Sequence, residues 1–293
     1  MELRVLQYFL AVCREQSISG AAEALHLSQP TLSRQLKDME EELGKQLLIR
    51  GNRRVSLTEE GMILRKRAEE IMELVHKAES EIALTDEYIA GDISVGAGET
   101  DGVRFLARAV KQLHGDYPDI HLHIISGDSE MVVESLDRGL IDFGFLSGEI
   151  DISRYESLRI PQTDSFGILM RKDSPLAEKD TIIPKDIIDA PLIVSRQMLQ
   201  KGDVGKVLRC SQDKLNIAAT YSLLYNGSLM VDEGLGYALC FDKIINVTGD
   251  SNLCFRPIQS SIEAPLYLVW KKYAMFTKAA EKFLLQMQEL SES

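Results

Sequence analysis

Hydrophobic positions in the first sixty residues recur at helical spacing and are interrupted twice by short polar segments. A first stripe predicts one helix and consists of Leu3, Leu6, Phe9, Leu10 and Cys13. Residues 17–36 then predict two short helices joined by a tight turn, with small residues at 21, 22 and 24 where they cross. A second stripe continues the buried face of the latter helix and consists of Leu32, Leu36, Met39 and Leu43. Gly44 ends that helix.

The last of these helices carries polar groups at its N-terminal end. Ser28 stands where an N-cap is expected and Pro30 falls in the first turn. The neighbouring polar side chains are Gln29, Thr31, Ser33 and Arg34. This arrangement is typical of the second helix of a helix-turn-helix, which enters the DNA major groove. The alternative is an ordinary two-helix hairpin, which the coincidence of cap, proline and polar groups within one turn disfavours.

The segment between Leu43 and Thr58 is basic and contains no acidic residue. Its cations are Lys45, Arg50, Arg53 and Arg54. The Gly51-Asn52 pair predicts a turn, so we expect a β-hairpin wing whose cations face phosphates.

Residues 1–60 resemble the winged helix-turn-helix of the LysR-type transcriptional regulators. The matching features are Phe9 with Ala21-Ala22, the run at 27–33, the run at 41–44 and the run at 57–61. Leu48 departs from the family, whose members mostly carry an aromatic residue there. Together the pattern and the resemblance predict these DNA-contacting residues: Ser28, Gln29, Pro30, Thr31, Ser33, Arg34, Arg50, Arg53 and Arg54.

A long helix is predicted for residues 58–90, which contain no proline and no glycine between Gly61 and the pair at 91–92. Its apolar positions alternate at spacings of four and three and are Leu64, Ala68, Ile71, Val75, Ala78 and Ile82. A helix of about 30 residues is roughly 45 Å long, more than a small winged domain covers. We therefore expect a seam between two copies of the chain. The alternative is one amphipathic helix packed on its own domain.

From residue 91 onward the pattern changes to alternating strands and helices. The predicted strands are Ile93 to Ala97, His121 to Ser126, Phe143 to Leu146, Phe166 to Arg171, Leu192 to Ser195, Leu215 to Thr220, Tyr237 to Phe241 and Leu266 to Trp270. The predicted helices are Val103 to His114, Glu130 to Arg138, Val204 to Cys210, Leu223 to Glu233 and Thr277 to Leu290. This alternation predicts an α/β fold with mainly parallel sheets, long enough for two lobes.

Residues 91–293 also resemble the LysR-type effector domain, which has the two-lobed fold of periplasmic solute-binding proteins. The shared features are Tyr117-Pro118, Gly127 with Ser129, and the runs at 139–142, 234–236 and 269–271. The resemblance implies an effector-binding domain at 91–293, with lobe one at 91–163 plus 267–293 and lobe two at 164–266. Two crossing strands would form the hinge. The expected fold class is thus a multidomain α/β protein with an N-terminal winged helix-turn-helix, a long linker helix and a two-lobed effector domain.

A ligand pocket is expected where strands end and helices begin, because helix N-termini supply unpaired N–H groups there. The candidate effector-binding residues are Thr100, Ser129, Leu146, Arg196, Gln197 and Tyr221. Thr100 and Ser129 offer hydroxyls, Arg196 a carboxylate clamp and Tyr221 a wall, although each Ser or Thr could serve only as a cap. Nearby acidic residues disfavour a strongly anionic effector and are Glu99, Asp101, Asp128 and Glu149. A neutral, zwitterionic or singly charged metabolite and a dicarboxylate both stay open.

Charge and composition fit a regulator whose acidity lies outside its DNA-reading part. The net charge of the 293 residues is -12, and residues 1–60 hold 8 Lys and Arg against 9 Asp and Glu, which leaves -11 on the remainder. Residues 5–13 are too short and too polar at Gln7 for a secretory signal, and no apolar run approaches the ~20 residues of a membrane span. We therefore expect a cytoplasmic protein without a membrane partner.

Competing functions receive little support from the residues. The common phosphate-loop, dinucleotide and hydrolase motifs are missing, so we expect no enzyme, and no cofactor. His121 and His123 share a strand face as in some zinc sites, but the sequence shows no third ligand, so no metal is predicted. Redox sensing at Cys210 would need a resolving cysteine close by. A solute-binding receptor would leave the first ninety residues without a role.

The predicted partners follow from this interpretation. They are double-stranded promoter DNA, a small-molecule effector, further copies of the chain in a dimer or tetramer, and RNA polymerase. In the mechanism implied by the resemblance, the effector changes lobe closure and thereby the DNA spacing that the oligomer holds.

Overall fold

A computed structural model of the chain describes residues 1–51, 54–83, 89–148, 151, 153–259 and 263–292. The chain divides into two compact units, Met1–Leu84 and Thr85–Ser293. None of the helices in these ranges is both long and apolar enough to cross a membrane.

The first unit begins with three short helices and a hairpin, here called the head. These are α1 (Leu3–Glu15), α2 (Ile18–Ala24), α3 (Gln29–Leu43), β1 (Leu48–Arg50) and β2 (Val55–Leu57). The predicted helix-turn-helix is confirmed as α2 and α3. Phe9 is fully buried at the centre of the head, whereas Leu3, counted in the predicted stripe of α1, is half exposed. Both ends of α3 follow from the sequence, because the Ser28 hydroxyl accepts from Thr31 N at 3.3 Å and Gly44 adopts a φ of 64°.

The hairpin closes the head against α3. Leu48 is buried under the wing, although it is smaller than the aromatic residue that most members of the resembling family carry there. The carboxylate of Glu40 on α3 accepts hydrogen bonds from the N–H groups of Leu47 at 2.7 Å and Leu48 at 3.0 Å. These bonds tie the start of β1 to α3. Asn52 and Arg53 lie outside the described residues.

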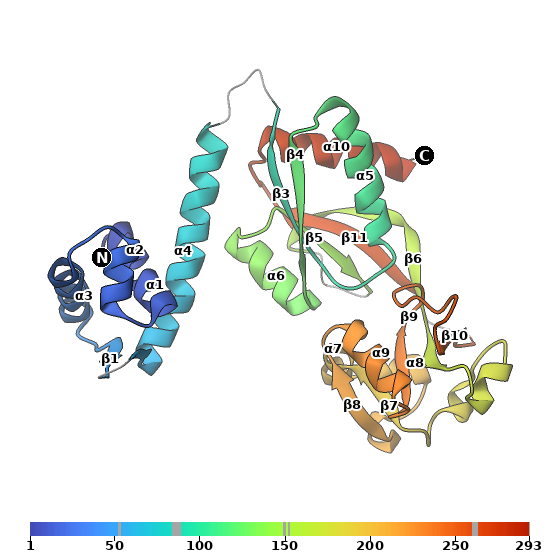
Figure 1. The fold of residues 1–293 in the computed structure, drawn as a ribbon. Coiled ribbons are helices and arrows are strands. Elements are labelled where there is room, and N and C mark those ends of the chain that lie inside the picture. The colour runs from blue at the N-terminus through green and yellow to red at the C-terminus, as the bar shows by residue number, and fades with distance from the viewer. Residues whose placement is uncertain (52–53, 84–88, 149–150, 152, 260–262, 293) are drawn as a thin grey trace. The chain divides into compact units, whose positions relative to one another are not determined.

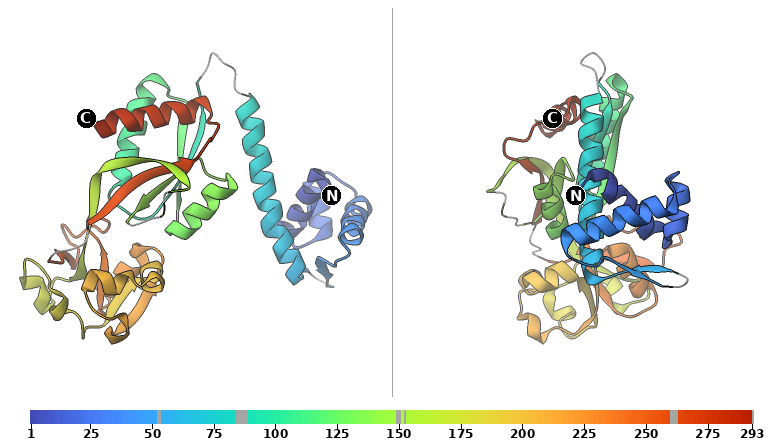
Figure 2. Two further views of the ribbon diagram at one scale, coloured as in Figure 1. Left: turned by 180° about the vertical axis from the view of Figure 1, so that it is seen from behind. Right: turned by 90° about the vertical axis from the view of Figure 1, so that its left-hand side faces the viewer.

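Helix α4 (Glu59–Ala83) is the predicted long helix, but only part of its apolar seam is available to a partner. Leu64, Ala68 and Ile71 pack into the core of the head, and Ala68 is fully buried. The prediction of an intermolecular seam is therefore wrong for these three residues, because α1 of the same chain covers them. Ala78 and Ile82 are exposed, on the part of α4 that continues past the short helices (Figure 2).

The second unit is built on one continuous nine-stranded sheet (Figure 1). Its path runs β4-β3-β5-β11-β6-β9-β7-β8, and β10 pairs with β6. The strands are β3 (Gly91–Ala97), β4 (Ile120–Ser126), β5 (Phe143–Ser147), β6 (Tyr155–Arg171), β7 (Leu192–Ser195), β8 (Ile217–Tyr221), β9 (Tyr237–Phe241), β10 (Leu253–Pro257) and β11 (Glu263–Lys271). Strand β3 is parallel to β4 and β5, and β7 is parallel to β8 and β9, as the alternating pattern predicted. Lobe one is built on β3, β4 and β5, and lobe two on β7, β8 and β9.

Helices cover both faces of each half of the sheet. They are α5 (Val103–Asp116), α6 (Ser129–Arg138), α7 (Arg196–Lys201), α8 (Asp203–Leu208), α9 (Leu224–Asp232) and α10 (Lys278–Glu292), with short 3-10 turns at Pro175–Glu178, Pro184–Asp186 and Gln212–Lys214. Alternate residues of β5 serve opposite faces: Phe143 and Phe145 pack under α5 and α10, and Leu146 packs under α6. In lobe two, Ile193 packs toward α9 and Val194 toward α8.

Strands β6 and β11 pass through both lobes as a long antiparallel pair. Ile160 and Leu266 belong to the core of lobe one, whereas Phe166 and Ala264 belong to that of lobe two. Leu266 thus packs in lobe one, although the predicted boundary assigned it to lobe two. The sequence missed the first half of β6 because it is polar and contains Pro161. This proline lies in an irregularity where Leu266 pairs with Ile160 and Pro265 with Thr163.

Candidate DNA-binding surface and inter-lobe cavity

The N-terminal end of α3 presents most of the predicted DNA-contacting side chains to solvent. The exposed residues are Ser28, Gln29, Pro30, Thr31 and Arg34. Ser28 also caps the helix, and its hydroxyl lies 2.7 Å from that of Thr31. Arg34 Nε lies 3.9 Å from Asp38 Oδ2, and both side chains are exposed, so this ion pair is weak.

A cation of the wing lies next to this helix. Arg50 Nη1 donates to the hydroxyl of Ser33 at 3.1 Å, and Nη2 lies 3.7 Å from Glu40. Ser33 is half-buried, while Arg54 is exposed beyond β1. Arg53 lies outside the described residues. The structure therefore places Arg50 beside the polar end of α3, an arrangement suited to contacts with base edges and phosphates together.

The second unit contains a cavity of about 490 Å³ with walls from both lobes. Four of the six predicted effector-binding residues line it: Ser129 and Leu146 from lobe one, and Gln197 and Tyr221 from lobe two. Tyr221 forms a wall, and its hydroxyl donates to the carbonyl oxygen of Leu239 at 2.8 Å.

Arg196 and Thr100 are not brought to this cavity. Arg196 is exposed at the first position of α7, and its neighbours Ser195 and Gln197 line the cavity instead. The structure therefore gives no support to the predicted Arg196 carboxylate clamp, because Arg196 is exposed and is not among the residues that line the cavity.

Thr100 makes hydrogen bonds within the protein. Its hydroxyl donates to Asp164 Oδ2 at 2.5 Å and accepts from Gly102 N at 3.0 Å, at the start of α5. Asp164 is buried on the crossing strand β6, and burial raises the pKa of its carboxyl to about 6. Thr100 is thus hydrogen-bonded to the crossing strand and does not line the inter-lobe cavity, and its contact with an effector stays a prediction.

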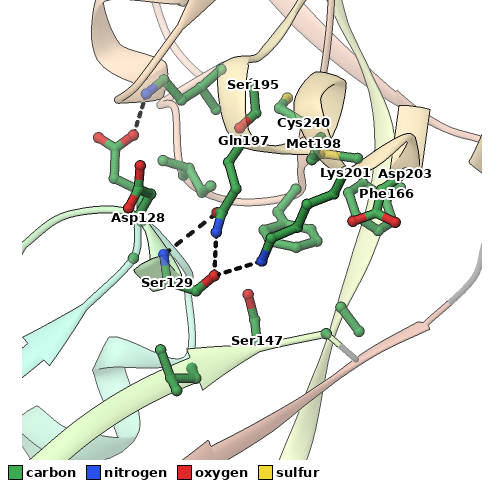
Figure 3. A pocket seen from close by; sticks show the side chains of 18 of the residues that line it. Asp128, Ser129, Ser147, Phe166, Ser195, Gln197, Met198, Lys201, Asp203 and Cys240 are labelled. Carbon is green, nitrogen blue, oxygen red and sulfur yellow. Dashed lines mark hydrogen bonds between the residues drawn. The ribbon is translucent and has the colours of Figure 1, made fainter. Parts of the chain in front are cut away.

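Two polar contacts span the cavity between the lobes. From α7, the Gln197 amide and the Lys201 ammonium both reach Ser129, with Lys201 Nζ 3.2 Å from the hydroxyl oxygen (Figure 3). From lobe one, the Glu99 carboxylate accepts a hydrogen bond from the N–H of Leu224. Sequence reasoning missed Lys201 and treated Glu99 only as a rim acid. Lys201 could have been found from its spacing, because it lies four residues after Gln197 and therefore on the same face of the helix.

The thiols and imidazoles do not form a second chemical site. Burial raises the pKa of Cys210, and the nearby Lys214 only partly opposes this, so the thiolate needed for redox sensing is disfavoured. His123 Nε2 lies 2.9 Å from Asp92 Oδ1, and His121 Nδ1 lies 4.0 Å from the same atom on the exposed sheet edge. Within the described part of the chain, no three His, Cys, Asp or Glu side chains are arranged to hold a metal ion.

Comparison with known proteins gives concordant matches over both units. Residues 3–62 match the bacterial regulatory helix-turn-helix protein, lysR family, and residues 86–291 match the LysR substrate binding domain. The HTH-type transcriptional regulator BsdA of Bacillus subtilis (strain 168) is 32% identical over 293 residues, which span 97% of this chain and 99% of that protein. The Hca operon transcriptional activator HcaR of Escherichia coli (strain K12) is 28% identical, over 99% and 98% of the two chains.

Solved structures share the fold over the full length. CbnR, a LysR family transcriptional regulator, aligns with a TM-score of 0.78 at 19% identity over 100% of both chains. Full-length CbnR complexed with its target DNA aligns with a TM-score of 0.76, also at 19% identity, over 99% of this chain and 100% of that one. These relatives are transcriptional regulators rather than enzymes.

Proposed function

Because the chain belongs to the LysR family of DNA-binding transcriptional regulators, we propose that it holds promoter DNA as an oligomer and responds to a small molecule bound in the inter-lobe cavity. The observation that carries this proposal is the presence of two independent sites. A polar helix tip with an adjacent cation suits a duplex groove, and a cavity with walls from two lobes suits a metabolite.

We infer the oligomer from the net charge of the chain and from the exposed apolar residues in the C-terminal half of α4. The whole chain carries a net charge of -12, so one head gains little from general attraction to phosphates. Two heads joined in a dimer would bind two half-sites. Leu74, Ala78 and Ile82 are exposed on α4, and Ile82 is 84% exposed. A second copy of α4 would cover them. Pairing of two dimers into a tetramer, and contact with RNA polymerase, belong to the same proposal, as does a cytoplasmic location.

Footprinting on the DNA upstream of the coding region tests the DNA part. We expect a protected dyad, with protection at two half-sites separated by about one helical turn or a multiple of it. Arg34→Ala should reduce the preference for this site over random DNA by about 1–3 kcal/mol if Arg34 contacts a base. Arg108→Ala, on α5 of the other unit, serves as the matched control and should leave protection unchanged. Absence of protection under all conditions would instead favour a solute-binding receptor.

A metabolite screen by thermal unfolding of the full chain tests the effector part, because a ligand that binds the folded state raises its stability. A true effector should also alter the footprint or the bend of the bound DNA. Ser129→Ala should keep the footprint and reduce the effector response. A normal response in this variant would remove Ser129 from the effector site, and unchanged DNA at saturation with a bound ligand would contradict the proposed coupling.

A further inference from the structure

Glu99 crosses from one lobe to the other at the end of strand β3. Its carboxylate accepts a hydrogen bond from the N–H of Leu224, the first residue of α9 in lobe two. The residue before α9, Leu223, offers no capping side chain. Glu99 therefore supplies the negative group that a helix N-terminus attracts, although it belongs to the opposite lobe. The start of α9 is already occupied by an anion of the protein itself.

The opposite arrangement is found at the start of α6. Here Ser129 offers a backbone N–H and a hydroxyl, and the partners from lobe two are the neutral amide of Gln197 and the ammonium of Lys201. Among the described residues, Lys201 has no carboxylate within ion-pair distance. The other lysine that lines the cavity, Lys206, lies 2.7 Å from Asp203. This end of the cavity thus combines a helix N-terminus, a hydroxyl and a cation that forms no ion pair with a carboxylate of the described residues.

The negative charge of Glu99 affects the pKa values of two groups that line the cavity. Tyr221 and Cys240 both line it, and burial raises the pKa of each. The charge of Glu99 adds to both shifts, as does that of Asp242 for Cys240. Three further carboxylates line the cavity: Asp128, Asp203 and Glu263. Of these, Asp203 is paired with Lys206. Asp128 is committed to capping α6 through Met131 N at 2.9 Å.

We propose that the negative charge of Glu99 makes the cavity select one class of ligand. The preferred ligand is a monocarboxylate with a hydrogen-bond donor at its other end, and dicarboxylates are rejected. This inference rests on the proposed effector function. The ligand carboxylate binds the N–H and hydroxyl of Ser129 and the Lys201 ammonium, and takes the place of the Gln197 amide. The apolar body lies along Phe166 and Met198. The donor faces Glu99, whose carboxylate has lone pairs beyond the one used by Leu224.

Matched acids that differ only at the second end test this proposal. The probes are 4-hydroxybenzoate against terephthalate, and 6-hydroxyhexanoate against adipate. Thermal unfolding of the full chain is followed by the fluorescence of its single tryptophan, Trp270, which lies in the second unit. For at least one pair, the hydroxy acid should bind about tenfold or more tightly than the diacid, because a second carboxylate would be placed beside Glu99.

The Glu99→Gln variant should abolish this difference. Its amide oxygen still accepts from Leu224 N, so the cap and the unliganded melting temperature should be kept, and the diacid should approach the hydroxy acid in affinity. Glu263→Gln is the matched control: Glu263 lines the same cavity but is exposed, so water screens its charge and the wild-type preference should persist. Ser129→Ala should weaken hydroxy acid and diacid alike.

Three results would overturn the proposal. One is equal or tighter binding of both diacids by the wild-type chain, and another is an unchanged preference in Glu99→Gln. The third is the failure of all four acids to stabilise the wild-type protein at millimolar concentration. Each of these leaves the promoter footprint untouched, so failure of the ligand class is distinguishable from failure of the proposed function.

Discussion

Replacement of the buried carboxyl Asp164 by asparagine should make the protein more stable at neutral pH. Asp164 is 6% exposed on β6, where the polypeptide passes from lobe one to lobe two. Burial raises the pKa of its carboxyl from 3.8 to about 6, the hydrogen bond from Thr100 and the charge of Lys243 oppose the rise, and Asp101 adds to it. Asparagine keeps an oxygen that can accept from Thr100 but never becomes charged.

The size and sign of the effect follow from linkage between protonation and folding. The rise in pKa from 3.8 to about 6 corresponds to at most about 3 kcal/mol of free energy in favour of the protonated folded state. This contribution is fully present below the unfolded pKa and is lost as the pH rises through the folded pKa. The stability of Asp164→Asn relative to wild type should therefore increase by about 2–3 kcal/mol between about pH 4 and about pH 8.

Urea unfolding of both proteins across this range, followed by Trp270 fluorescence, measures the difference. The subtraction cancels the titration of carboxyls shared by the two proteins, such as Asp173 and Asp186. Thr100→Val removes the hydrogen bond that lowers the pKa of Asp164. In this variant the stability that depends on protonated Asp164 should therefore be lost at a higher pH than in the wild type. A difference between Asp164→Asn and wild type that stays constant with pH, or that grows toward acid, would refute the reasoning.

Three further substitutions test the packing of the first unit, two of them against a control substitution on α5 of the second unit, each by thermal unfolding followed by circular dichroism. Ala68→Leu should destabilise the head by about 1–3 kcal/mol, because this position of α4 is fully buried, whereas Ala107→Leu at an exposed position of α5 should be nearly neutral; equal effects would contradict the packing. Gly61→Ala should destabilise, since its Cβ would overlap a backbone carbonyl oxygen of the head, while Gly115→Ala in open space on α5 should stabilise by about 0.5–1 kcal/mol; the same sign for both would be inconsistent with this geometry. Glu40→Ala should cost about 1–3 kcal/mol through two unpaired N–H groups at β1, and retained stability would show that water replaces the carboxylate.

Local signals predicted the helix-turn-helix well, and the reason is physical. The cap at Ser28, the terminator at Gly44 and the buried stripe of α3 all depend on residues within a few positions of each other. Short, continuously apolar strands such as β7 and β9, which are buried along most of their length, were found for the same reason. The first half of β6 was not, because its pairing with β11 is long-range and overrides a polar segment with a proline.

The contacts that individual side chains make could not be predicted from residue spacing alone. Arg196 and Gln197 are adjacent at a helix start, yet only Gln197 lines the cavity. Thr100 was predicted to share a site with Ser129 because both follow a strand. Its hydroxyl instead donates a hydrogen bond to Asp164, which is buried on a segment distant in the sequence. Likewise, the periodicity of α4 predicted an apolar face without saying which partner covers Ala68. A pattern predicts burial more readily than it predicts the neighbour.

The docking of α10 on lobe one has a consequence for how the protein is made. Ala280, Phe283 and Met287 of this helix are fully buried in the core of lobe one, beside strands that precede them by more than a hundred residues. As the chain leaves the ribosome, lobe one stays incomplete until residues 278–292 have been translated, whereas the β7–β9 core of lobe two can assemble earlier. A premature stop codon just before α10 would therefore expose an apolar surface to chaperones and proteases, although most of the coding sequence had been read.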